Sequence, residues 1–214
     1  MSEVFYYYGK NSSYVFEQFI RHFLISIYGV LFAALIAIPL GFFVARRKKL
    51  SRITISIANV MQTIPSLAML AILMFAIGTG PNTVVFAVFL YAILPILKNT
   101  VSGINSVTPE LIDAATGMGM TKKQLMTKVE LPLAISIIMG GIRNALVLAI
   151  GVTAVGTFIG AGGLGDIITR GITVANGSPI IIAGAIPTAL MAVLADLVLG
   201  TIENKLTPRT FTKI

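Results

Sequence analysis

One long uncharged segment limits what this chain can fold into. No Asp, Glu, Lys or Arg occurs between Phe23 and Ala45, and a basic cluster at 46–49 follows at once. A helix of this length crosses the hydrocarbon core of a bilayer, which is about 30 Å thick. The composition agrees, since 56% of the 214 residues are hydrophobic and only 11% are charged. The sequence therefore predicts an integral membrane protein rather than a soluble domain.

Hydropathy and the positions of basic residues together predict five membrane-spanning helices. Their expected bounds are about 23–45, 53–77, 84–103, 133–158 and 180–202. The third helix is extended past Lys98, whose side chain can snorkel, because without this crossing the lysines of the next loop would face outside. Basic residues concentrate on the cytoplasmic side, so the N-terminus is predicted outside and the C-terminus inside.

The expected fold class is therefore all-α integral membrane. We expect an extracytoplasmic N-terminal segment at 1–18, a membrane domain at 19–203 and a cytoplasmic tail at 204–214, with a cytoplasmic loop at 104–132. Apolar spacing after Leu164 predicts a short outer helix. One copy of this size encloses little space, so a polar pathway is expected to need a second subunit.

Several kinds of site are not expected on this chain. It has no cysteine and a single histidine, which argues against disulfides, thiolate metal sites and metal clusters. The net charge of +8 lies beside apolar segments, as in membrane proteins, so nucleic acid is not an expected partner. No GxxxxGK[ST] occurs, and the GxGxxG at 160–165 follows no predicted strand, so ATP is expected to bind another chain. We predict no catalytic residue, metal or cofactor here.

Local rules predict a first short helix in the loop 104–132. Thr108 is the expected N-cap, and Pro109 suits the first helical position. Gly117 and Gly119 are expected to end the helix. Gly119 lies where the chain must turn back, a position that often requires a positive φ.

A second short helix is predicted to begin after Thr121. Thr121 and Gln124 have the spacing of a capping box, and the helix is expected to end near Glu130, where Pro132 limits it. Both helices are too short to be stable in water without a partner surface. From the residues alone, docking on another protein and an amphipathic loop resting on lipid headgroups both remain open.

The same loop carries a recognisable pattern. The pattern is EAA-x3-G-x9-I-x-LP, where x is any residue. The residues that match it are Asp113, Ala114, Ala115, Gly119, Val129, Leu131 and Pro132. Asp for Glu and Val for Ile are conservative departures. The chain thus resembles the membrane subunits of ATP-binding-cassette (ABC) importers of the type I permease architecture, in which this loop inserts into a cleft on the ATPase. The resemblance implies that docking involves Asp113, Ala114, Ala115, Gly119, Leu131 and Pro132, and we assign Thr121, which begins the second loop helix, to the same docking loop.

The resemblance also implies an assembly in the bacterial plasma membrane. Its other members would be a second permease subunit, identical or paralogous, cytoplasmic ATPases that bind ATP and Mg²⁺, and an extracytoplasmic substrate-binding protein. ATP binding would drive alternating access of the membrane subunits to the two sides.

Two further stretches bear on the substrate. QTIPSLA at 62–68 and GAGGLGD at 160–166 look like the permeases of importers for the osmoprotectants glycine betaine, carnitine and choline. D-methionine permeases are similar in size and in the glycine motif, so they remain an alternative. An ion-coupled secondary transporter or channel, which needs no ATPase, is the alternative from another class.

Polar residues recur with helical spacing in the second predicted span. Asn59, Gln62, Thr63 and Ser66 would lie on one face, and Pro65 is expected to kink the helix. This stripe either lines the substrate path or forms hydrogen bonds with neighbouring helices.

Arg143 and Asp196 are the two ionisable residues inside the predicted spans, apart from the snorkelling Lys98. Both fall in the inner half of the membrane, so an ion pair is expected, within one subunit or across a dimer. Direct binding of a zwitterionic substrate by these residues is the alternative.

Overall fold

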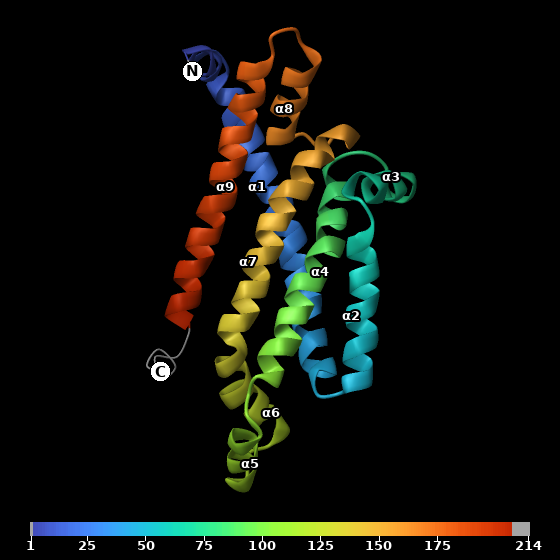
Figure 1. Cartoon of the computed structure of the whole chain (residues 1–214), viewed down its shortest axis with the longest axis vertical. Helices are drawn as coiled ribbons and strands as arrows, with labels where there is room; N and C mark the ends of the chain where they lie inside the picture. Colours follow the sequence, from blue (N-terminus) through green and yellow to red (C-terminus); the bar gives the residue numbers. More distant parts are fainter. Residues whose placement is uncertain (1, 207–214) are drawn as a thin grey trace.

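The computed structural model describes residues 2–206 of the chain, and these form helices without strands. The longer helices run along one axis of the molecule (Figure 1). The elements in chain order are α1 Ser2–Ala45, α2 Lys48–Thr63, α3 Ser66–Ile77, α4 Pro81–Asn105, α5 Pro109–Gly117, α6 Lys122–Leu125, a π-helical turn η1 Met126–Glu130, α7 Leu131–Val155, a 3₁₀ turn η2 Gly156–Ile159, α8 Leu164–Thr173 and α9 Ser178–Leu206.

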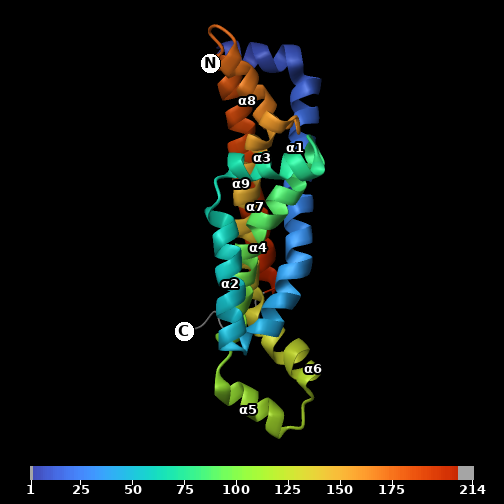
Figure 2. The same cartoon turned by 90° about the vertical axis from the view of Figure 1, so that its right-hand side faces the viewer.

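Within the described residues, four helices are long and apolar enough to cross a membrane. They are α1, α4, the continuous segment Lys122–Ile159 and α9, and the bent pair α2–α3 can serve as a fifth crossing. The predicted spans lie within these elements. Residues 2–18 of the expected N-terminal segment belong to α1, whose first turns bend across one end of the bundle (Figure 2). From residue 207 onward, the predicted tail falls outside the described residues.

The predicted span at 53–77, with its expected kink at Pro65, is sharply broken in the structure. The structure has two helices, α2 and α3, that meet at an angle of 96°. Ile64 adopts an extended conformation, as expected before Pro65, which also removes one backbone donor. The hydroxyl of Tyr91 on α4 donates to the Ile64 carbonyl at 2.5 Å, so the break leaves this acceptor satisfied. A predicted kink is thus a sharp break, and α3 lies across the bundle.

The expected helix end near Pro132 is wrong. The chain stays helical from Lys122 to Val155 because the π-helical turn at Met126–Glu130 precedes the proline. In that turn the Leu131 N–H donates to the carbonyl of Met126, five residues back. A wider turn relieves the conflict between a proline ring and the preceding turn of helix. The loop helix and the membrane helix α7 are therefore one continuous element.

The core is centred on α4, which packs between α1 and α7 and also contacts α2 and α3. Small residues allow these close approaches. A Cβ atom at Gly29 of α1 would lie 2.3 Å from Val88, and one at Gly141 of α7 would lie 2.8 Å from the Pro95 carbonyl oxygen. Close backbone packing of this kind is the main source of helix association in lipid.

Candidate docking loop and polar membrane site

The loop helices α5 and α6 project beyond one end of the bundle (Figures 1 and 2). Thr108 occupies the N-cap position of α5, with Pro109 as the first helical residue, although the Thr108 side chain makes no capping bond. Two hydrogen bonds close the C-terminal end of α5. The Gly119 N–H donates to the Thr116 carbonyl at 2.9 Å, and the Met120 N–H donates to the Ala115 carbonyl at 3.2 Å. With φ of +81° at Gly119, this is a Schellman motif.

The second loop helix begins with the predicted capping box. The Gln124 N–H donates to Thr121 Oγ1 at 3.3 Å, and the Thr121 N–H donates to Gln124 Oε1 at 2.8 Å. Both ends of the intervening turn are thus defined by hydrogen bonds within a few residues, as local sequence rules require.

The predicted docking residues divide into two groups. Asp113, Ala114, Gly119 and Thr121 are exposed on the loop, whereas Ala115 is only 2% exposed and holds α5 in place. Half-buried Leu131 and Pro132 lie at the base, where α7 begins. Leu131 and Pro132 therefore belong to the base of the loop and not to its exposed surface.

Large apolar side chains remain uncovered on this loop. Leu111 is 45% exposed and Met118 is 73% exposed. Ala115 of the same segment is buried, whereas Leu111 and Met118 are exposed. Exposed apolar groups beside polar ones are typical of a protein-binding surface.

An ion pair that sequence reasoning missed ties the loop to the membrane domain. Arg46, just after α1, donates to Glu130 at 2.6 Å, and Glu130 is buried at the base of the loop. The basic cluster at 46–49 marked the membrane boundary but gave no sign of this partner, because the two residues are far apart in sequence.

The four residues of the predicted polar stripe are not held on one face. Asn59, Gln62 and Thr63 lie on α2, whereas Ser66 begins α3, beyond the break at Pro65. Thr63 bonds to the Val60 carbonyl of its own helix at 2.7 Å. Gln62 donates to the Tyr91 carbonyl on α4 at 3.3 Å and, alone among the four, lines a polar cavity.

This polar cavity, of about 440 Å³, lies between α2, α4 and α7. Its polar lining comes from Gln62, Lys98, Asn99, Ser102 and Asn144. The last four were not predicted as site residues. The sequence did contain a signal for these four residues, because polar residues in apolar helices need a partner or water. They form a group only once α2, α4 and α7 are packed together.

Arg143 and Asp196 are brought together within one subunit. Arg143 Nε and Nη2 donate to the two carboxylate oxygens of Asp196 at 2.9 and 2.8 Å, a bidentate geometry. Arg143 Nη1 also donates to Glu203 at 2.9 Å, and Ser136 donates to the other oxygen of Glu203 at 3.0 Å. Glu203 was missed because it lies just past the predicted span. Its spacing of seven residues from Asp196 nevertheless places both on one face of α9.

The glycine-rich segment at the opposite end is held by α1. The Gly163 N–H donates to Gln18 Oε1 at 2.7 Å, and the Leu164 N–H donates to His22 Nδ1 at 3.2 Å. Since Nδ1 accepts, Nε2 carries the proton and donates to the Ile150 carbonyl at 3.0 Å. The single histidine therefore joins α1, α7 and the start of α8.

The predicted short outer helix is α8. Asp166 in its first turn accepts from Arg170 at 2.8 Å and from the hydroxyl of Tyr14 on α1. The Arg170 guanidinium also lies 4.7 Å from the centroid of the Tyr14 ring. These contacts, like those of Gln18 and His22, link α1 to α8 and the glycine-rich segment before it.

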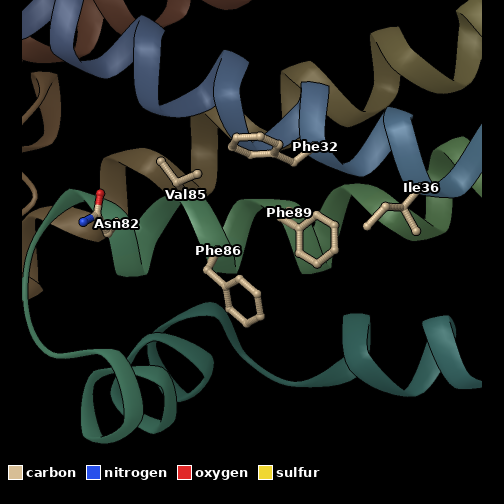
Figure 3. Close-up of a pocket in the computed structure, with 6 residues that line it drawn as sticks. All are labelled: Phe32, Ile36, Asn82, Val85, Phe86 and Phe89. Atoms are coloured by element: carbon tan, nitrogen blue, oxygen red, sulfur yellow. The ribbon is translucent and has the colours of Figure 1, made fainter.

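An apolar groove of about 400 Å³ lies between α1 and α4 (Figure 3). Its lining includes Phe32, Phe86 and Phe89, with Asn82 as the polar residue. Because most of this lining is apolar, the groove suits lipid chains rather than a charged solute. No cluster of three or more potential metal ligands is found in the part of the chain that the structure describes.

Comparison with known proteins assigns this architecture. Residues 37–208 match the family described as binding-protein-dependent transport system inner membrane component. The chain belongs to this family. It is therefore a multi-pass permease subunit of the inner membrane, and the family match covers α4, the loop helices and α7.

Individual relatives and a solved structure agree. The carnitine transport permease protein OpuCD of Listeria monocytogenes is 61% identical over 202 residues, covering 94% of this chain and 91% of that protein. The glycine betaine/carnitine/choline transport system permease protein OpuCD of Bacillus subtilis is 58% identical over 94% of this chain and 88% of its own length. A chain of the MetNI methionine ABC transporter, in an inward-facing conformation, superposes with a TM-score of 0.82 at 21% identity, over 91% of this chain and 96% of that one, and so shares the fold.

Proposed function

We propose that this permease subunit imports quaternary-ammonium osmoprotectants, namely glycine betaine, carnitine and choline, using ATP hydrolysed on a partner subunit. The observation that carries the substrate class is the 61% identity to a carnitine permease along nearly the whole chain. The similarity to the methionine transporter supports the fold alone, since identity there is 21%. The methionine alternative therefore has no support beyond shared architecture.

Docking of a cytoplasmic ATPase is assigned to the α5–α6 loop. Support comes from exposed Leu111 and Met118, and from the exposed motif residues Asp113, Ala114, Gly119 and Thr121. ATP and Mg²⁺ bind the ATPase in this proposal, and this chain contributes no catalytic residue. A second permease subunit and an extracytoplasmic binding protein complete the assembly.

Coupling follows from the continuity between the loop and α7. Movement of a docked loop is transmitted along Lys122–Val155 because no flexible linker interrupts the helix. The Arg46–Glu130 pair passes the same movement to α1, and the Arg143 cluster passes it to α9. Rearrangement of these helices would expose the polar face of α2, α4 and α7 alternately to the two sides.

Reconstitution tests this proposal. The chain is purified in complex with an ATPase, a second permease subunit and a binding protein, and placed in proteoliposomes. We expect ATP-dependent uptake of glycine betaine, carnitine or choline, and stimulation of ATP hydrolysis by the binding protein loaded with the same compound. Uptake of D-methionine but none of these three would overturn the substrate class. Equal uptake without the ATPase would overturn the ATP-driven mechanism.

A further inference from the structure

The polar cavity between α2, α4 and α7 carries one cationic and several neutral polar side chains beside the apolar Leu94 and Pro95. Its lining supplies one ammonium from Lys98, one hydroxyl from Ser102 and the side-chain amides of Gln62, Asn99 and Asn144. No Asp or Glu contributes to it. An ammonium beside hydroxyl and amide donors favours an anion, and above all a small one such as a carboxylate.

Three of these donors have no partner among residues 2–206. The Gln62 amide already bonds to the Tyr91 carbonyl, and the Asn99 amide bonds to the Pro95 carbonyl at 2.8 Å. The side chains of Lys98, Ser102 and Asn144 form no hydrogen bond or ion pair within the described residues. The cavity therefore presents donors that are available to a ligand.

Lys98 lies within α4 and, like Ser102 and Asn144, is exposed beside the cavity. Lys98 lies seven residues before Asn105, the last residue of α4, or about 10 Å along the helix axis. Ionisable groups at such depth in membrane helices face a polar cavity or a partner. Nearby carboxylates are already engaged, since Arg143 binds Asp196 and Glu203.

An ion-pair cluster adjoins the cavity. Asn144 also lines a second cavity of about 550 Å³ between α7 and α9, together with Asp196. The cluster there combines Arg143 with two carboxylates, Asp196 and Glu203. Asn144 therefore borders both the cavity that Lys98 lines and the cavity that Asp196 lines.

We propose that Lys98, with Ser102 and Asn144, forms a subsite that holds the carboxylate of a zwitterionic substrate during its passage. This inference rests on the proposed function and adds a specificity determinant to it. It requires that Lys98 act on substrates with a carboxylate and matter little for substrates without one.

Glycine betaine and choline form a matched pair for the test, because choline has a hydroxymethyl group where glycine betaine has its carboxylate. The reconstituted complex carrying Lys98→Gln is assayed for uptake of each compound, with binding protein saturated by it, and for stimulated ATP hydrolysis. We expect glycine betaine uptake to fall about ten-fold relative to choline uptake, the loss typical of one charge-assisted hydrogen bond. Lys98→Arg should recover most of it. Lys49→Gln removes an exposed basic residue elsewhere and should change neither rate.

Each result decides the question. Equal loss for both compounds, or no loss, overturns the subsite. A Lys98→Gln defect seen only in vesicles that contain phosphatidylglycerol, and not in pure phosphatidylcholine, shows a lipid headgroup at Lys98 and also overturns it. Wild-type uptake of choline alone overturns the subsite while leaving the proposed function intact. Absence of ATP-dependent uptake of either compound by the wild-type complex overturns the proposed function itself.

Discussion

The two ends of this permease are built by different means. At the docking end, α5 and α6 are fixed by hydrogen bonds between residues at most five apart, and much of their surface is exposed. At the opposite end, the glycine-rich segment is fixed by Gln18 and His22, more than 140 residues away, and much of it is buried. Locally determined structure leaves side chains free for a partner, whereas structure held by distant residues uses its side chains internally.

Cysteine labelling tests whether the two ends lie on opposite sides of the membrane, and its outcome is all-or-none. The chain has no native cysteine, so single cysteines at Lys48, Lys123, Lys10 and Thr173 report their side of the membrane. We expect the first two to react only from the cytoplasm and the last two only from outside, because basic clusters lie inside. Labelling of position 123 from outside intact cells would remove both the predicted topology and the docking assignment.

His22→Leu should have the largest effect on stability. The substitution leaves the Leu164 N–H and the Ile150 carbonyl without their partner in a buried site, which costs about 2–4 kcal/mol. We expect a lower midpoint of thermal unfolding for the purified complex in detergent. His22→Gln, which can both accept and donate, should recover part of the loss. An unchanged midpoint for His22→Leu would mean that the outer end does not depend on this contact.

Gly119→Val should separate function from stability. A β-branched residue at φ +81° costs about 1–3 kcal/mol, confined to the loop. We expect near-normal abundance in the membrane but loss of co-purified ATPase and of uptake. Gly117→Ala is the matched control, because its φ is ordinary and a Cβ there meets nothing within 4 Å. Full uptake by the Gly119→Val variant would contradict the docking assignment.

Thr121→Ala should have the smallest effect. It removes one half of the capping box, worth about 1 kcal/mol in an exposed helix. We expect a modest reduction in ATPase retention, smaller than for Gly119→Val, with no change in thermal unfolding of the membrane domain. A defect as large as that of Gly119→Val would indicate that Thr121 contacts the ATPase directly.

The contrast between the ends also explains which site residues could be predicted. The loop helices and the capping box follow from residues that are close in sequence. The docking-loop pattern is similarly short. By comparison, only Gln62 of the predicted stripe lines the polar cavity, and Lys98 and Asn144 were not assigned to it. Those residues come from three helices whose relative rotation no local pattern reports.

The sequence by itself determined where apolar helices run, how the docking loop begins and ends, and which family pattern it carries, because hydropathy and capping act over a few residues. Tertiary structure decided the rest. The break at Pro65 reaches 96°, with the Ile64 carbonyl satisfied by Tyr91, and Pro132 is tolerated because a π-turn precedes it. Arg143 forms ion pairs with both Asp196 and Glu203 because α7 and α9 pack side by side. Such contacts depend on packing between distant segments, which a linear pattern does not encode.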